Sequence, residues 1–379
     1  MPSLVDSLPS RQTAIIAQGP GKVAVVHDVL VPRVVSPNTA IVKTAAVAIN
    51  PVDAKMLDYS AASGAVHGYD FAGIIVALAE EGVPTHLAVG DRVAGLVHGM
   101  NSLKPEIGAF ADYICATADL LLKIPDQMSF EDAATLGMGL GTAGMALFKE
   151  LNVPGSLDFL NEEKNQEEEV QKPPPSKAKA MPFILIYGGS TATGTRAIQL
   201  AKMSGLRPIA TCSPQNFDLV RSFGAEQVFD YHDERSAAEI RSYTRNSLVY
   251  ALDCISLSQT TQFCLAAIGR AGGRYVALEP YRERLASIRK AVKMSWIMML
   301  TIFGERVALD GVYGRDAQPG DYEFGKKLFG KMQRLLDQGE DIVRTHPVQL
   351  MGGRWEGVVK GLDLIRASEL SGRKLVYSI

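Results

Sequence analysis

Apolar positions change their spacing about halfway along the chain. Up to residue 125 they form short strand-like runs separated by Gly and Pro turns, of which residues 13–17 and 40–49 are the clearest. From residue 182 onward, apolar runs alternate with stretches of helical spacing. The first pattern predicts a β-rich, barrel-like domain, and the second predicts a parallel sheet with helices on both faces. We therefore expect an α/β protein.

The second pattern begins with a strand, a glycine-rich turn and a helix. Residues 183–187 are continuously apolar, as in a strand buried on both faces, and Gly188, Gly189 and Gly194 follow. Glycines let the backbone turn sharply, and a helix N-terminus offers free N–H groups and a positive dipole end to an anion. The unit predicts a pyrophosphate site, in which Thr191 replaces the middle glycine of the G-x-G-x-x-G pattern. A purely structural turn is the alternative.

The next strand, residues 208–213, ends in a turn without a carboxylate. NAD-binding units usually place Asp or Glu there to hold the ribose 2′-OH, whereas this turn reads Ser-Pro-Gln-Asn. The missing acid removes repulsion against a 2′-phosphate, to which Ser and Asn side chains can donate hydrogen bonds. An ordinary turn of residues that loops favour is the alternative. We predict NADPH/NADP+ as the cofactor, with contacts from Ser213, Pro214, Gln215, Asn216 and Tyr231.

Composition and charge narrow the class of protein. A length of 379 residues suits two domains, and a net charge of −2 argues against general nucleic-acid affinity. The strongest apolar run, residues 296–303, is far too short to span a membrane. The N-terminal residues show no secretory signal. The cysteines, 4 in all, are scattered, which favours a reduced, cytoplasmic setting.

Several motifs occur in an order that resembles a known family. They are N-P-x-D at 50–53, G-Y-D-x-x-G at 68–73, G-D-x-V at 90–93, G-x-F-x-x-Y at 108–113 and G-G-S-x-x-x-G at 188–194. With them, the chain resembles the zinc-free, quinone-reductase-like side of the medium-chain dehydrogenase/reductase superfamily. The segments at 187–193, 251–255 and 369–372 are similar to those of the stand-alone enoyl reductases that serve fungal polyketide synthases in trans.

This resemblance implies a Rossmann cofactor domain and a GroES-like catalytic domain. We place the catalytic domain at 1–154 and 305–379, and the Rossmann domain, with a doubly wound parallel sheet, at 182–304. Residues 155–181 form an insertion of mixed charge and proline, which predicts a solvated loop between the domains. Contact of this insertion with a partner protein is the alternative.

No metal site is expected in this chain. Zinc-dependent members of the superfamily use Cys and a G-H-E histidine as ligands. Here that position reads Gly68-Tyr69-Asp70, and no cysteine lies near Asn50. The adjacent His67 alone makes no site, so we expect it to be structural or to line the substrate site.

The resemblance implies NADPH-dependent reduction of an α,β-unsaturated thioester. Hydride transfer to the β-carbon develops enolate charge on the thioester oxygen, so catalysis needs positioning and hydrogen-bond donors, followed by a proton for the α-carbon. We predict Lys55 as a donor, because the family places the 50–55 turn against the nicotinamide and ribose. Thr142 is predicted to bond the ribose or the substrate. An ordinary surface lysine and a helix-start threonine are the respective alternatives.

Further contacts are predicted for the cofactor and the acyl chain. Cofactor contacts are expected from Val52, Asp53, Ala54, Lys55, Ser190, Thr191, Ala192, Thr193, Leu278, Glu279, Ser371 and Gly372. The resemblance implies an acyl tunnel lined on one side by Ala143, Gly144, Met145, Ala146, Leu147, Phe148, Lys149 and Glu150. Its other wall would be Met298, Met299, Leu300, Thr301 and Ile302, which would suit a reduced polyketide chain.

The resemblance also implies a partner, the acyl-carrier domain of an iterative type I polyketide synthase or of its hybrid with a nonribosomal peptide synthetase. A basic stretch with helical appearance offers positive charge for docking, and a merely solvated helix face is the alternative. Its cations are Arg282, Arg284, Arg289, Lys290 and Lys293. The subgroup suggests a monomer. Two other functions stay open: an NADPH quinone or enone reductase acting on diffusible molecules, and a non-enzymatic protein that only binds NADP(H).

Overall fold

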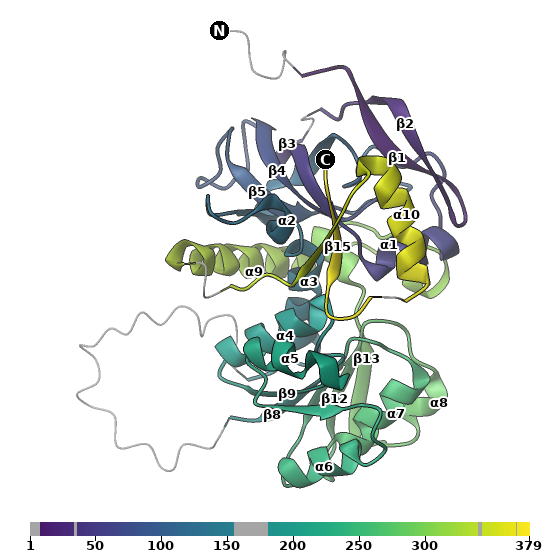
Figure 1. The fold of residues 1–379 in the computed structure, drawn as a ribbon, viewed down its shortest axis with the longest axis vertical. Helices are drawn as coiled ribbons and strands as arrows, with labels where there is room; N and C mark the ends of the chain where they lie inside the picture. Colours follow the sequence, from purple (N-terminus) through teal and green to yellow (C-terminus); the bar gives the residue numbers. More distant parts are fainter. Residues whose placement is uncertain (1–7, 34–35, 155–180, 340–342, 369) are drawn as a thin grey trace, which may run out of the picture. The chain divides into compact units, whose positions relative to one another are not determined.

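The computed structural model describes residues 8–33, 36–154, 181–339, 343–368 and 370–379. By their contacts they form two compact units, the first comprising Met1–Gly141 with Met298–Ile379 and the second Thr142–Ile297 (Figure 1). The division falls within helix α3 (Gly137–Gly144). The second unit thus begins before residue 182, where we predicted the Rossmann domain to start. The predicted insertion lies, apart from Met181, outside the described residues.

The second unit is built on a six-stranded sheet in the order β10-β9-β8-β11-β12-β13. Every neighbouring pair is parallel, which confirms the predicted doubly wound sheet. The short, continuously apolar runs form its strands because both faces of such a sheet are covered. The strands are β8 (Phe183–Tyr187), β9 (Arg207–Cys212), β10 (Gln227–Asp230), β11 (Tyr250–Asp253), β12 (Gly273–Ala277) and β13 (Val292–Trp296).

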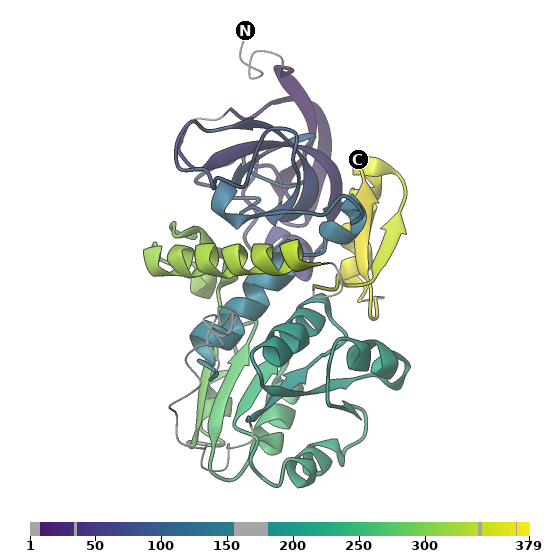
Figure 2. The same cartoon turned by 90° about the vertical axis from the view of Figure 1, so that its left-hand side faces the viewer.

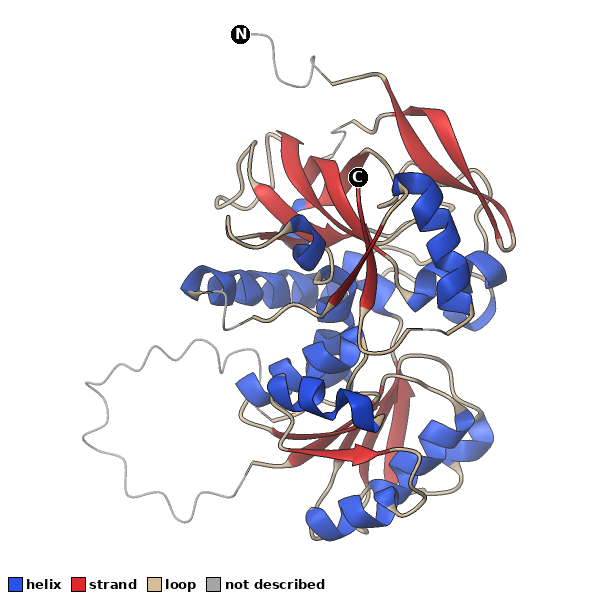
Figure 3. Ribbon diagram, viewed as in Figure 1, coloured by secondary structure: helices blue, strands red, loops and turns tan. Residues whose placement is uncertain are grey.

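Helices connect these parallel strands. They are α4 (Ala192–Met203), α5 (Phe217–Ser222), α6 (Ser236–Tyr243), α7 (Ser258–Ala267) and α8 (Glu283–Ala286). The last three lie together against the sheet (Figure 3), where Ile240 of α6 and Leu265 of α7 pack with Leu185 and Tyr275. A π-helical segment, η3 (Met145–Glu150), continues α3 and contacts β13.

The first unit contains a sheet in the order β14-β15-β3-β4-β5-β7, with β6 also paired to β3, and a separate β1-β2 hairpin. All these pairs are antiparallel except β14 with β15. This agrees with the β-rich domain predicted from the alternating runs. The strands are β1 (Arg11–Gly19), β2 (Lys22–Leu30), β3 (Thr39–Ala48), β4 (Asp70–Leu78), β5 (Arg92–Leu96), β6 (Tyr113–Thr117), β7 (Leu121–Lys123), β14 (Val348–Met351) and β15 (Lys374–Ser378).

The C-terminal part of the first unit packs onto its N-terminal part. Helix α9 (Pro319–Gln338), the long yellow-green helix of Figure 2, lies against the 3₁₀-helix η7 (Met299–Phe303). Gln333 of α9 accepts a hydrogen bond from the Lys123 N–H at 2.8 Å. This unit also contains α1 (Pro51–Tyr59), α2 (Phe130–Ala133) and α10 (Arg354–Arg366). The unit is therefore discontinuous in sequence.

The predicted basic helix is wrong in extent. Only Glu283–Ala286 is helical, and Lys293 lies in strand β13. The guanidinium of Arg289 points inward, where it donates hydrogen bonds to the carbonyls of Leu265, Ile268 and Gly269 at 2.6–2.7 Å. It thereby caps the C-terminus of α7, where carbonyls lack partners within the helix and a cation is favourable. The five cations do not form one face.

Two glycines of α9 differ in what surrounds them, which gives a matched test of the packing. A Cβ on Gly325 would lie 2.5 Å from Cγ1 of Ile302, whereas a Cβ on Gly330 would meet nothing within 4 Å. We expect Gly325→Ala to lower the free energy of unfolding by about 1–3 kcal/mol through overpacking. Gly330→Ala should raise it by up to about 1 kcal/mol through helix propensity. Urea unfolding measures both, and equal effects would contradict this packing.

Candidate cofactor and active site

The carboxyl ends of the strands in the second unit gather predicted cofactor residues at one edge of the sheet. β8 and β11 are neighbours although β9 and β10 lie between them in sequence. Ligands of doubly wound sheets bind outside the carboxyl ends at such a switch point. The loops and first helical turns after β8, β9, β10 and β12 carry Ser190, Thr191, Ala192, Thr193, Ser213, Pro214, Gln215, Asn216, Tyr231, Leu278 and Glu279.

The glycine turn after β8 is closed tightly against the start of α4. A Cβ on Gly194 would lie 2.3 Å from the Gly188 carbonyl oxygen, and one on Gly189 would lie 2.7 Å from Cβ of Ala210. Thr191 caps the helix, since its hydroxyl oxygen accepts from the Gly194 N–H at 2.9 Å. Residues 190–193 are half-exposed. The turn therefore presents the N-terminus of a 12-residue helix to solvent, which fits the diphosphate of a dinucleotide.

Asp253, at the end of β11, holds two of the edge loops in place. Its buried carboxylate accepts hydrogen bonds from the N–H groups of Ile255 and Ser256 at 3.0 and 2.8 Å. The pKa of Asp253 is raised because the carboxyl is buried, and these hydrogen bonds offset only part of that shift. Ser256 has a left-handed backbone (φ 63°), and its hydroxyl accepts from the Leu278 N–H at 2.8 Å. The loops after β11 and β12 are thus tied together beside Gly188.

The turn after β9 carries no carboxylate, as its sequence indicates. The hydroxyls of Ser213 and Tyr231 lie 3.1 Å apart, so the loops after β9 and β10 meet there. The Tyr231 side chain is 39% exposed and lies 4.0 Å, ring to ring, from His232. Pro214 and Gln215 are exposed, whereas Asn216 is buried. Hydroxyl groups are therefore presented at the end of β9, where NAD-binding units usually carry an acid.

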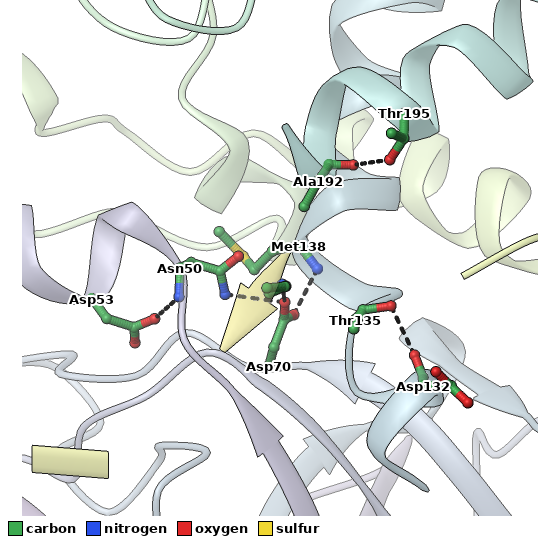
Figure 4. A network of polar contacts seen from close by, with 9 residues as sticks. Asn50, Asp53, Asp70, Asp132, Thr135, Met138, Ala192 and Thr195 are labelled. Atoms are coloured by element: carbon green, nitrogen blue, oxygen red, sulfur yellow. Dashed lines mark hydrogen bonds and ion pairs between the residues drawn. The ribbon is translucent and has the colours of Figure 1, made fainter. Parts of the chain in front are cut away.

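In the first unit, a buried carboxylate joins four segments of the chain (Figure 4). Asp70, at the start of β4, is completely buried. It accepts hydrogen bonds from the Asn50 amide at 3.0 Å and from the Met138 N–H at 2.7 Å. It also forms an ion pair with Lys374 of β15 at 2.5 Å. We call these four residues the Asp70 cluster.

Helix α1 begins at this cluster, and Asp53 lies in its first turn. Asp53 is completely buried, and its carboxylate accepts from the Asn50 N–H at 2.6 Å in a capping box. Burial raises the pKa of this carboxyl well above its ordinary value. We predicted Asp53 as a cofactor contact; its side chain is buried in the unit, and the contact stays a prediction. The Asn50-x-x-Asp53 spacing is itself a capping signal that predicts the capping role.

The Asp70 cluster brings together segments that we predicted to contact the nicotinamide. Residues 371 and 372 lie shortly before β15, whose Leu375 carbonyl accepts from the Ile49 N–H at 3.0 Å. The 50–55 turn and the 371–372 turn therefore meet at one end of β3. Lys55 is exposed on α1, Ser371 is exposed, and Gly372 has a left-handed backbone (φ 64°). Val52 is half-buried and Ala54 is buried.

The residues predicted to line the acyl chain are mostly buried. Thr142 lies inside α3 rather than at a helix start and is 9% exposed. In the 143–150 segment, Phe148, Lys149 and Glu150 reach the surface, whereas Ala143, Met145, Ala146 and Leu147 are buried. In η7, Thr301 donates a hydrogen bond to Asp321 at 2.5 Å, and Ile302 is completely buried. Their contact with an acyl chain stays a prediction.

Sequence reasoning missed two features, a buried ion pair and a buried arginine. The Asp70–Lys374 pair joins residues 304 positions apart, and no local pattern links them. The only signal was an acid at the position where zinc-dependent relatives carry G-H-E. Arg196 of α4 is 2% exposed, and burial lowers its pKa to about 10. Its place in the helix that follows the glycine turn was readable, but its burial was not.

The Asp70 cluster can be tested by a double-mutant cycle. Removing one member of a buried ion pair leaves an uncompensated charge, so Asp70→Asn and Lys374→Met should each lower the free energy of unfolding by about 3–5 kcal/mol. The double variant should lose clearly less than the sum of both. Urea unfolding of the four proteins measures this coupling, and additive losses would contradict a direct interaction.

Two family models match the chain. The alcohol dehydrogenase GroES-like domain matches residues 36–126, and the zinc-binding dehydrogenase model matches residues 192–291. In the part of the chain that the structure describes, no three His, Cys, Asp or Glu side chains gather as a metal-binding group. None of the described helices combines the length and the apolar character of a membrane span.

Solved structures of low sequence identity share the fold. The CurK enoyl reductase is 19% identical with a TM-score of 0.71, and the match covers 97% of this chain and 99% of that one. A putative zinc-dependent alcohol dehydrogenase from Rhizobium etli is 23% identical with a TM-score of 0.73, covering 97% and 98%. The predicted combination of GroES-like and Rossmann folds is thereby confirmed.

Curated relatives match over the whole length. The trans-enoyl reductase caaB of Aspergillus niger is 58% identical and traG of Penicillium crustosum 55%, each over 100% of both chains. The trans-enoyl reductase thnE of Trichoderma harzianum is 54% identical over 98% of this chain and 97% of the relative. They confirm the subgroup predicted from the motifs. The chain therefore belongs to the trans-enoyl reductases of the medium-chain dehydrogenase/reductase superfamily, whose enoyl reductases bind a nicotinamide cofactor.

Proposed function

We propose that the chain reduces, with NADPH, the α,β-unsaturated thioester of an intermediate held by a fungal polyketide synthase. The observation that carries this proposal is identity at more than half of all positions with three full-length proteins named trans-enoyl reductase. The arrangement of the sheet edge and of the Asp70 cluster supports it, because each gathers residues that the chemistry needs. An NADPH quinone or enone reductase acting on diffusible molecules is the alternative.

The reaction asks for a donor at the thioester oxygen. When bound, the cofactor supplies a hydride for the β-carbon, and negative charge develops on that oxygen. A fixed donor stabilises such charge more than it stabilises the ground state. We assign this role to Lys55, which α1 presents at the surface of the first unit. Thr142 is assigned a hydrogen bond to the nicotinamide ribose or to the substrate.

The choice of NADPH rests on the turn after β9. The glycine turn and the first turn of α4 would hold the diphosphate through backbone N–H groups. Ser213 and Tyr231, whose hydroxyls lie 3.1 Å apart, would donate to a 2′-phosphate, which an acid at this turn would repel. Two neutral hydroxyl groups can contact either NADPH or NADH. The preference for NADPH therefore rests on the absence of an acid from this turn.

The substrate would arrive on the acyl-carrier domain of the synthase, or of its hybrid with a nonribosomal peptide synthetase. A growing chain remains covalently tethered to its carrier, so a separate reductase must associate with the synthase to reach the thioester. The word trans in the names of the relatives describes such an arrangement for those proteins. We assign the same arrangement to this chain.

The role of Lys55 predicts a loss of turnover without a loss of structure. Lys55→Ala should lower kcat with a crotonyl-pantetheine thioester about 100-fold or more and change KM little, because a transition-state contact is removed. NADPH oxidation gives both constants. Lys43→Ala, which removes another exposed lysine of this unit, should keep wild-type kcat. Wild-type turnover by Lys55→Ala would refute the role, and preferred turnover of simple quinones by the wild type would favour the alternative function.

The cofactor preference predicts a switch by one substitution. Ser213→Asp should weaken NADPH binding and strengthen NADH binding, since a carboxylate repels the 2′-phosphate and accepts from a ribose 2′-OH. We expect the ratio of kcat/KM for NADPH over NADH to fall by about 100-fold, or about 2.7 kcal/mol. Ser213→Ala, which removes only the hydroxyl, should lower NADPH affinity without improving NADH. If the ratio is unchanged in Ser213→Asp, the 2′-phosphate does not bind at this turn.

A further inference from the structure

Cations without acids gather at the amino ends of β11, β12 and β13. The three segments that lead into these strands, residues 244–250, 268–274 and 288–293, contain no Asp or Glu. Although the net charge of the chain is −2, this cluster creates a positive local potential. Its cations are Arg245, Arg270, Arg274, Arg289, Lys290 and Lys293.

Three of these cations line one hollow. An open hollow of about 590 Å³ is lined by Arg274, Lys290 and Lys293 together with Tyr250 and small residues. Arg274 and Lys293 are register partners on the adjacent strands β12 and β13. Both side chains are cations, and like charges held side by side repel each other. None of the residues that line the hollow is acidic, so no carboxylate among them offsets the charges of Arg274 and Lys293.

The hollow's cations are available, in contrast to Arg289, which caps α7. Lys290 and Lys293 are exposed, and among the described residues neither forms a salt bridge. Arg274 donates one hydrogen bond, to the Leu151 carbonyl at 3.3 Å. The neighbouring η3 segment adds Lys149 and Glu150, whose charges cancel. The hollow therefore keeps its positive charge.

This hollow lies away from the cofactor edge. Its residues are at the amino ends of the strands, whereas the glycine turn and the loops after β9 and β12 are at the carboxyl ends. β12 has 5 residues, which corresponds to about 17 Å at the usual rise of a strand. An anion bound in the hollow therefore leaves the cofactor edge of this unit accessible. The hollow is not a second part of the diphosphate site.

We infer that the hollow lined by Arg274, Lys290 and Lys293 is an anchoring surface for an acidic protein face of the synthase. The inference rests on the proposed function, which requires association with a synthase. A contact at the amino ends holds the reductase in place while the carboxyl edge stays free for the cofactor. Exposed charge pairs of this kind set association rate and salt dependence more than the chemistry.

Charge reversal tests the surface separately from catalysis. The probe is the full-length polyketide synthase whose product requires this chain, immobilised for interferometry. Lys290→Glu/Lys293→Glu should bind it about tenfold more weakly than the wild type, and the wild-type affinity should fall as salt rises. Both proteins should oxidise NADPH with crotonyl-pantetheine thioester at the same kcat. Lys290→Gln/Lys293→Gln should give an intermediate affinity, which separates loss of attraction from new repulsion.

The matched control is Arg282→Glu/Arg284→Glu, which reverses two exposed cations of the same stretch outside the hollow. It should bind the synthase within about twofold of the wild type, as expected for charges away from the contact. Equal binding by wild type and the lysine double variant, or equal losses in both double variants, would overturn the inference. Tighter synthase binding after removal of residues 156–180 would also overturn the inference, since the chain's own acidic segment would then be the occupant. Oligonucleotide binding by the wild type that the lysine double variant alone loses would overturn it as well.

If the wild type does not turn over the thioester at all, the proposed function fails, whatever the binding result. If turnover is normal but the lysine variant binds the synthase as the wild type does, only the anchoring surface fails.

Discussion

The first unit depends on the neutralisation of one carboxylate. Asp70 has no exposure to solvent, so its charge needs the Lys374 ammonium and two hydrogen-bond donors in fixed positions. Each donor belongs to a different segment, and the geometry of all four segments is therefore set together. Gly137 makes this approach possible, because a Cβ there would lie 2.6 Å from the Asp70 carboxylate. Asp70 thus has a structural role in this unit.

The second unit also contains a buried carboxylate, at the edge of its sheet, but the groups that stabilise it are different. Asp253 is also buried, but its partners are backbone N–H groups and the hydroxyls of Thr260 and Tyr275, at 2.6 and 2.9 Å, all within 22 positions of it. A short-range network of this kind orients loops, whereas the long-range Asp70 cluster joins distant segments. In each unit, a buried acid fixes the backbone next to some of the predicted contacts: Asp70 next to the 50–55 turn, and Asp253, through Ser256, next to Leu278.

Local signals carried much of the prediction. The glycine turn at 188–194, the parallel strands and the short antiparallel strands were readable because spacing and turn residues are properties of adjacent positions. The basic stretch at 282–293 was predicted to be helical because its charges are spaced like those of a helix face. In the structure, Lys293 lies in strand β13 and Arg289 caps α7. Pairing of Asp70 with Lys374 was not readable, since one sequence contains no record of which distant residues meet. The capping role of Asp53 was visible in its spacing from Asn50, but it was not predicted.

The wide separation of the Asp70–Lys374 pair has a consequence for synthesis on the ribosome. The two residues are 304 positions apart, and at about 5–20 residues per second the lysine emerges roughly 15–60 s after the acid. The entire Thr142–Ile297 unit is translated within that interval. The nascent chain can therefore complete its cofactor-binding half while the other half still lacks the counter-ion of its central carboxylate. A late-arriving lysine makes closure of that half one of the last events in the maturation of the polypeptide.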